Sequence, residues 1–177
     1  MTHKLPIKPD EIAFALQNHS YEAKQYLDLE TGKIIMITAD NEAALDEILD
    51  AVHDDALALP DFSALLAQSD LQDWQQMETL EAYRIKVNVS GYLLVEPDNS
   101  YDGYNDMENF IETAHSERVQ ERLWDAIQGK GAFRRFKDVL LDYPAERERW
   151  FAFKETLMRQ RAVDFLADND IIALNEE

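Results

Sequence analysis

An apolar periodicity in the last third of the chain constrains the fold more than any other feature of the sequence. From residue 107 to residue 167, large apolar side chains recur three and four residues apart, which is the spacing of one buried helix face. Ser116 can cap one of these helices, Gly129 can end it in the left-handed conformation, and Pro144 ends the next apolar stripe. We therefore expect several packed helices, closed by a long helix over about 145–167.

The first part of the chain mixes signals for strands and helices. Residues 24–38 predict a β-hairpin, because the turn at 30–33 contains Gly32, which tolerates a positive φ, and a β-branched run follows it. A helix is expected before the hairpin, over about 8–18. Another is expected after it, where Asn41 can serve as the N-cap.

The middle of the chain gives a weaker pattern. Apolar spacing predicts helix from about Pro60 to Ala82. Residues 84–95 are ambiguous, because the alternation at the start of this segment is typical of a strand while 92–95 resembles a separate extended run. A third strand is therefore possible there.

Length and composition favour one globular domain. The chain has 177 residues, of which 46% are hydrophobic, and only five Gly and five Pro, so no flexible linker is expected. We predict an α+β fold: a mostly helical single domain with a small antiparallel sheet, acidic and α/β over about 1–98 and helical over about 99–177. The chain lacks cysteine, which excludes disulfides and thiolate chemistry, and has no long apolar run, so we expect a cytoplasmic protein without a membrane partner.

Charge is distributed unevenly along a chain whose formal net charge is -19. Residues 1–115 carry 6 Lys and Arg against 23 Asp and Glu, whereas residues 116–177 carry 11 against 13. Between Lys33 and Arg84 there are twelve carboxylates and no basic residue. Such a segment repels phosphate backbones. It is either a solvated acidic face or a surface that binds a basic partner or imitates the charge of nucleic acid.

A basic and aromatic cluster stands out against this background. The segment GKGAFRRFKD at 129–138 supplies four candidate anion- or partner-binding cations, which are Lys130, Arg134, Arg135 and Lys137. A helix starting near Ala132 would turn Phe133 and Phe136 inward, with Arg135 nearly opposite that stripe. The cations either neutralise carboxylates of the chain or hold an external anion or acidic partner. The glycine spacing of a phosphate-binding loop is absent.

Two further cations, Lys154 and Arg161, fall inside the apolar arc of the closing helix. A cation in an apolar stripe is costly unless its head reaches water or a carboxylate. One interpretation is therefore an ion pair with Asp106, Glu108 or Asp125. The other is a cleft in which both cations, together with Lys130, hold an anionic substrate. Candidate residues that would line such a site are Tyr101, Asp102, Tyr104, Glu108 and Trp150.

The sequence contains no standard catalytic or cofactor signature. The histidines His3, His19, His53 and His115 are scattered and form no metal-binding pair, and neither a nucleophile elbow nor a dinucleotide fingerprint is present. We therefore predict no catalytic residues, no metal and no cofactor.

Three blocks of sequence carry a resemblance to a known family. SYDGYNDMENFIE at 100–112, GKGAFRRFKDVL at 129–140 and ERWFAFKETLMRQRAVDFL at 148–166 resemble, in order and spacing, uncharacterised protein family 0158 of the UPF series, as does YLDLETG at 26–32. The resemblance implies a single bacterial cytoplasmic domain with helix continuing past Tyr83, and it implies no reaction. It draws attention to Asp102, Tyr104, Glu108, Lys130, Arg134, Phe136, Lys137, Trp150 and Lys154, which lie in the matching blocks.

Three functions remain open from the sequence. The first is a non-catalytic binding or regulatory protein that presents a basic and aromatic site on its C-terminal helices to an unknown protein or a small anionic ligand. The second is an enzyme that holds a small anionic substrate with Lys130, Lys154 and Arg161. The third is weak binding of nucleic acid through residues 129–138, which the overall charge disfavours.

Overall fold

The computed structural model describes residues 2–18, 20, 22–52 and 58–174. Its elements are β1 (His3–Leu5), α1 (Pro9–Gln17), β2 (Ala23–Asp28), β3 (Ile34–Thr38), α2 (Ala39–Val52), α3 (Leu59–Leu66), α4 (Asp73–Val87), a short 3-10 turn η1 (Val89–Gly91), β4 (Tyr92–Val95), α5 (Ser100–Glu112), α6 (Glu117–Ala126), α7 (Ala132–Leu141), α8 (Pro144–Asp168) and β5 (Ile171–Ala173). The prediction of a mostly helical α+β domain with a small antiparallel sheet is confirmed.

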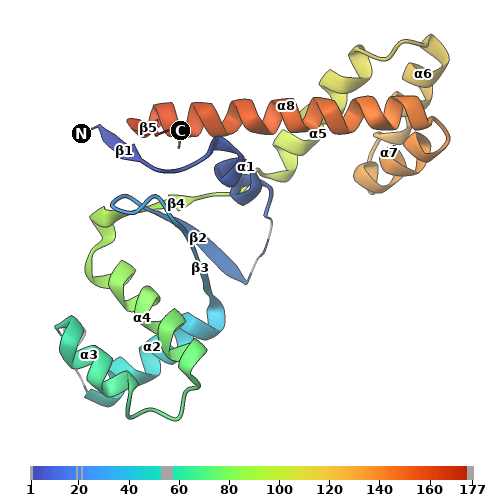
Figure 1. Ribbon diagram of the computed structural model, residues 1–177. Coiled ribbons are helices and arrows are strands. Elements are labelled where there is room, and N and C mark those ends of the chain that lie inside the picture. Colours follow the sequence, from blue (N-terminus) through green and yellow to red (C-terminus); the bar gives the residue numbers. More distant parts are fainter. Residues whose placement is uncertain (1, 19, 21, 53–57, 175–177) are drawn as a thin grey trace.

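The sheet has the strand order β3-β2-β4, with both pairs antiparallel. Gly32 turns the hairpin at φ 74°. The Asp28 carboxylate accepts hydrogen bonds from the Glu30 N–H at 2.8 Å and from the Thr31 hydroxyl at 2.8 Å, which closes the turn. The possible third strand is β4. A second, parallel pair joins β1 to β5, so two segments from opposite parts of the sequence lie side by side (Figure 1).

The three-stranded sheet lies between two groups of helices (Figure 1). On one face, α1 and the second half of α8 bury a core that includes Ile12, Leu27 and Ala162. On the other face, α2, α3 and α4 bury a core around Phe62 and Tyr83, whose rings stack with centroids 3.9 Å apart. Because successive strand residues point to opposite faces, one short sheet serves both cores.

The helices α5, α6 and α7 surround the first half of α8 and form a third core. Figure 1 shows α8 as a long rod that reaches from this group back to α1. Four aromatic rings pack together there, those of Phe110, Phe136, Trp150 and Phe153. The rings of Phe136 and Trp150 meet edge to face, with their centroids 4.9 Å apart. The predicted long closing helix thus holds the two halves of the molecule together.

Local features differ from the sequence predictions at three positions. Helix α2 begins at Ala39, so Asn41, predicted as the N-cap, lies inside the helix. The Oδ1 atom of Asn41 accepts a hydrogen bond from the N–H of Thr38, the residue before the helix, at 2.8 Å. Ser116 stands at the N-cap of α6 without a side-chain capping bond. Phe133, predicted to point inward, is 43% exposed, because it lies at the edge of the buried stripe of α7 and rests on the helix face at Gly103.

Residues 84–95 combine helix and strand. Helix α4 continues past Tyr83 to Val87, the chain turns through η1, and β4 follows. The Leu29 N–H donates to the Gly91 carbonyl at 2.9 Å, which starts the pairing of β4 with β2. Of the alternating apolar residues, Ile85 is buried in the core of α2, α3 and α4, whereas Val87 and Val89 are exposed, because residues two apart lie on opposite sides of a helix.

Candidate functional site

A buried carboxylate binds both cations of the α8 stripe. Asp106 of α5 is 1% exposed; its Oδ2 lies 2.6 Å from Lys154 Nζ, and its Oδ1 lies 2.7 Å from the Arg161 guanidinium. Arg161 also donates to Asp98, in the segment between β4 and α5. Of the three carboxylates that the sequence offered as partners, the structure uses Asp106.

Arg161 is held in its charged form by this arrangement. Burial tends to lower the pKa of the guanidinium, but the hydrogen bonds and negative charges of Asp106 and Asp98 outweigh it and raise the pKa above its usual range. Two carboxylates and two cations thus neutralise one another at the point where α5, α8 and the end of β4 meet. We call these four residues the Asp106 cluster: Asp98, Asp106, Lys154 and Arg161. The cluster joins the two halves of the domain, and both of its cations are bound within the molecule.

Arg135 also binds within the molecule. Its Nε donates to the Ala126 carbonyl at 2.9 Å, and its terminal nitrogens donate to the carbonyls of Gln128 and Lys130. These acceptors lie at the end of α6 and in the turn that follows, where carbonyls lack partners within the helix. Gly129 and Gly131 adopt φ values of 74° and 79° in this turn, so the glycine prediction for Gly129 agrees with the structure.

Of the remaining cations of the segment, Arg134 and Lys137 lie on one exposed face of α7, and Lys130 lies in the turn that precedes this helix. Lys130 and Lys137 are exposed and form no ion pair within the described part of the chain, and Arg134 has only a distant contact of 3.8 Å with Asp138. Phe133 and Leu141 are exposed on the same side, because residues 133, 137 and 141 recur at helical spacing. We call this set the α7 face: Lys130, Phe133, Arg134, Lys137 and Leu141.

The structure therefore separates the six predicted cations into two groups. Lys154, Arg161 and Arg135 bind oxygen atoms of the chain itself, whereas Lys130, Arg134 and Lys137 face solvent. Among the described residues, Lys130 forms no ion pair with Asp106 or Asp98. Leu141 was missed by the sequence reasoning, although its spacing of four residues from Lys137 was a signal that could have found it.

The residues predicted to line a site have mixed surroundings. Tyr104 and Trp150 pack against the third core, and the Asp102 carboxylate accepts from the Asn99 N–H at 3.2 Å and so caps α5. Glu108 is half-buried, and Tyr101 is exposed. Within the described part of the chain, none of these five forms an ion pair with the cations of the α7 face, although Gly103, which lies between Asp102 and Tyr104, contacts Phe133.

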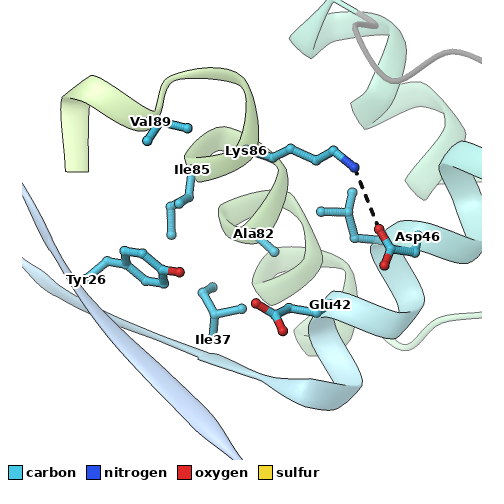
Figure 2. Close-up of a pocket in the computed structure, with 9 residues that line it drawn as sticks. Tyr26, Ile37, Glu42, Asp46, Ala82, Ile85, Lys86 and Val89 are labelled. Atoms are coloured by element: carbon cyan, nitrogen blue, oxygen red, sulfur yellow. Dashed lines mark ion pairs between the residues drawn. The ribbon is translucent and has the colours of Figure 1, made fainter. Parts of the chain in front are cut away.

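A hollow of about 340 Å³ lies in the acidic half, between the sheet, α2 and α4 (Figure 2). Its walls are mostly apolar, and its charged groups are paired: Lys86 Nζ lies 3.7 Å from Asp46, and Lys24 Nζ lies 2.7 Å from Glu42. Figure 2 shows Lys86 reaching across to Asp46 at its edge. Nine residues line the hollow: Tyr26, Ile37, Glu42, Leu45, Asp46, Ala82, Ile85, Lys86 and Val89. This hollow could not be predicted from the sequence, because its residues come from separate elements.

The described part of the chain has neither a metal-binding group nor a membrane span. Across residues 2–18, 20, 22–52 and 58–174, no three His, Asp or Glu side chains gather to hold a metal ion. His19 and His53 lie outside those residues. Within the same part of the chain, no helix combines the length and apolarity that crossing a membrane requires.

Comparison with known proteins agrees with the resemblance seen in the sequence. A model of the uncharacterised protein family UPF0158 matches residues 59–177. This chain belongs to that family. It is 28% identical, over 167 residues, to the UPF0158 protein PA5073 of Pseudomonas aeruginosa, a match that covers 94% of this chain and 85% of the relative. No solved structure matches the chain. The UPF0158 match includes α5 to α8, and therefore both the α7 face and the Asp106 cluster.

Proposed function

We propose that this UPF0158 protein is a non-catalytic binding module that docks an acidic, partly apolar segment of a partner protein on its α7 face. The observation that carries the proposal is the exposure of Lys130, Arg134 and Lys137 beside two exposed apolar side chains, Phe133 and Leu141. Cations with free head groups attract carboxylates, and apolar neighbours add contact area.

The charge of the whole chain supports a docking role for these cations. In a protein with a formal net charge of -19, a cation not needed for an internal ion pair stands out as a positive region on a negative surface. Arg135, in the same segment, binds backbone carbonyls and so stabilises the fold. The other three cations of the segment remain exposed at the surface. Helix α7 is anchored through buried Phe136 and Leu140, and so presents the face rigidly.

The enzyme hypothesis receives less support. It required the head groups of Lys130, Lys154 and Arg161 to converge on a substrate, but two of them are neutralised by Asp106 and Asp98. Releasing them for a substrate would leave a carboxylate that is 1% exposed without its partners. Binding therefore accounts better for the arrangement than catalysis.

The proposal is tested with a fluorescent synthetic peptide in which Glu and Leu alternate, titrated with the protein while anisotropy is recorded. We expect saturable binding that weakens as salt is added, because screening reduces attraction between exposed charges. The double variant with Arg134→Glu and Lys137→Glu should bind at least about tenfold more weakly, as loss of rim charges commonly lowers affinity. Arg118→Glu, a change of the same kind at an exposed position of α6, is the matched control and should bind like the wild type.

Two other probes distinguish the alternatives. A labelled single-stranded oligonucleotide and inorganic phosphate are titrated under the same conditions. Binding of either one in preference to the acidic peptide, with the same loss in the double variant, would replace the proposal by nucleic-acid or anion binding. Equal binding of the peptide to the wild type and the double variant would remove the α7 face from consideration.

A further inference from the structure

Strand β3 is an edge of the three-stranded sheet, and its outer side carries unpaired backbone groups. The Asp28 N–H donates to the Lys33 carbonyl at 2.9 Å, and the Ala39 N–H donates to the Glu22 carbonyl at 2.8 Å. In an antiparallel pair the residues that exchange bonds alternate along the strand. Ile35 and Ile37 therefore bond to β2, and the N–H and C=O groups of Ile34 and Met36 point away from the sheet.

These outward groups have no partner within the described part of the chain. Neither Ile34 nor Met36 exchanges a backbone hydrogen bond outside the ladder with β2. The next outward N–H, that of Thr38, already donates to Asn41 Oδ1 at 2.8 Å. The open edge thus consists of two donors and two acceptors, which is what a further strand needs in order to pair.

A groove of about 840 Å³ runs beside this edge, between the hairpin and α1. Phe14 and Met36 line it and are 73% and 53% exposed, so apolar surface borders the unpaired backbone. The groove carries Lys8 and Lys33 together with two carboxylates, those of Asp10 and Glu11, and is locally neutral in a strongly acidic molecule. A second acidic chain is therefore repelled less here than at the acidic helices.

We infer that β3 pairs antiparallel with β3 of a second copy of this chain, which joins two three-stranded sheets across a twofold axis. In the register that sets Ile34 opposite Met36 of the second copy, all four free groups of each strand are used. Lys33 directly precedes β3 and Asp40 follows it, and both are exposed. In this register Lys33 of each copy lies opposite Ile37 of the other, about three residues from its Asp40, and the two opposite charges attract. The same contact covers the exposed Met36 side chains.

Strand β4 provides an internal comparison, because it is the opposite edge of the same sheet. Leu94 of β4 lies opposite Tyr26 in a pair without backbone bonds, so the N–H and C=O groups of Leu94 point away from the sheet. The side chain of Leu94 is 39% exposed. A charge placed at Leu94 therefore changes an edge strand in the same way as a charge at Met36. Only the latter lies on the side proposed to bind the second copy.

Sedimentation of the full chain tests the pairing. We expect the wild type to sediment at twice the chain mass of 20.5 kDa, with dissociation on dilution. Met36→Lys should weaken the dimer by at least about tenfold, because a charged side chain on an edge strand opposes pairing. Leu94→Lys should leave the dimer unchanged. A wild type that stays monomeric, or equal effects of the two variants, would overturn the inference.

A cysteine variant tests the register without depending on Met36→Lys. The chain has no cysteine, so Ile35→Cys introduces a single thiol. In the proposed register, residue 35 lies opposite its own copy in a pair without backbone bonds, where cross-strand Cβ atoms are close enough for a disulfide. Oxidised glutathione should link most of Ile35→Cys into covalent dimers. Ile172→Cys, at an exposed site on β5, is the control and should remain unlinked; the same yield for both variants would contradict the register.

Discussion

The acidic helices α2 to α4 and the C-terminal helices α5 to α8 differ in where their charged side chains lie. Around α2 to α4, carboxylates stay at the surface and the core is apolar, with Phe62 stacked on Tyr83. Around α5 to α8, a carboxylate is buried at Asp106 and two cations are drawn into the structure to neutralise it. The difference teaches that, among the described residues of these helices, cations are drawn inward to neutralise Asp106 in the second region, whereas Arg84 and Lys86 of α4 pair with carboxylates at the surface.

The comparison is tested most strongly by Asp106→Ala. We expect a loss of about 3–5 kcal/mol in the free energy of unfolding, because Lys154 and Arg161 would be left without the carboxylate that they surround. Urea denaturation followed by circular dichroism measures it. Asp138→Ala, on the exposed side of α7, is the control and should change stability by less than about 0.5 kcal/mol. Similar small losses for both would mean that the buried cluster does not hold the two halves together.

A second prediction separates two neighbouring arginines. Arg135→Ala should cost about 1–3 kcal/mol, because carbonyls at the end of α6 lose a charged donor. Arg134→Ala should cost less than about 0.5 kcal/mol, since its side chain is exposed. Thermal unfolding gives both values, and the acidic peptide gives the opposite ranking, with weaker binding only for Arg134→Ala. Equal stability losses would place both arginines in the same structural role.

A third prediction compares glycines from the two halves. Gly129 and Gly32 share a φ of 74°, but an added Cβ at Gly129 meets no atom within 4 Å, whereas at Gly32 it lies 3.1 Å from Pro6 Cδ. Gly129→Ala should therefore cost only the backbone strain, about 1–2 kcal/mol. Gly32→Ala should cost more, because the hairpin turn must also move away from Pro6. Chemical denaturation of both variants checks the order, and a larger loss at Gly129 would show that its turn is packed more tightly than the contacts indicate.

The smallest expected effect is a pH dependence at the hairpin turn. Burial tends to raise the pKa of the Asp28 carboxyl, but hydrogen bonds from Glu30 and Thr31 outweigh it and hold the pKa below its usual range. A lowered pKa in the folded state adds stability above the unfolded pKa, and this stability is lost as the pH falls through the folded value. An NMR titration of the Asp28 carboxyl carbon should show the lowered pKa. Asp28→Asn should lose part of the acid dependence of unfolding; an ordinary Asp28 pKa would contradict this prediction.

Much of the fold could be predicted from particular residues. The helices of the last third followed from apolar spacing, the hairpin from Gly32 and the β-branched run after it, and the long last helix from the pattern after Pro144. The pairing of β1 with β5 could not be predicted, because each has only three residues and their partners lie at opposite ends of the chain. The prediction that Phe133 points inward was wrong, because Phe133 lies at the edge of the apolar stripe of α7. Periodicity identifies the members of such a stripe but not which of them lie at its edge.

The sequence by itself determined where the hairpin and most of the helices form, since propensity and periodicity act over a few neighbouring residues. It also determined that cations would be concentrated in the last third of an acidic chain. The tertiary structure alone decided which of those cations are free. Arg161 meets Asp106 across 55 positions of sequence, and Arg135 meets carbonyls that only the turn after α6 brings within reach. Such pairings depend on how the helices pack, because charges interact through space and not along the chain.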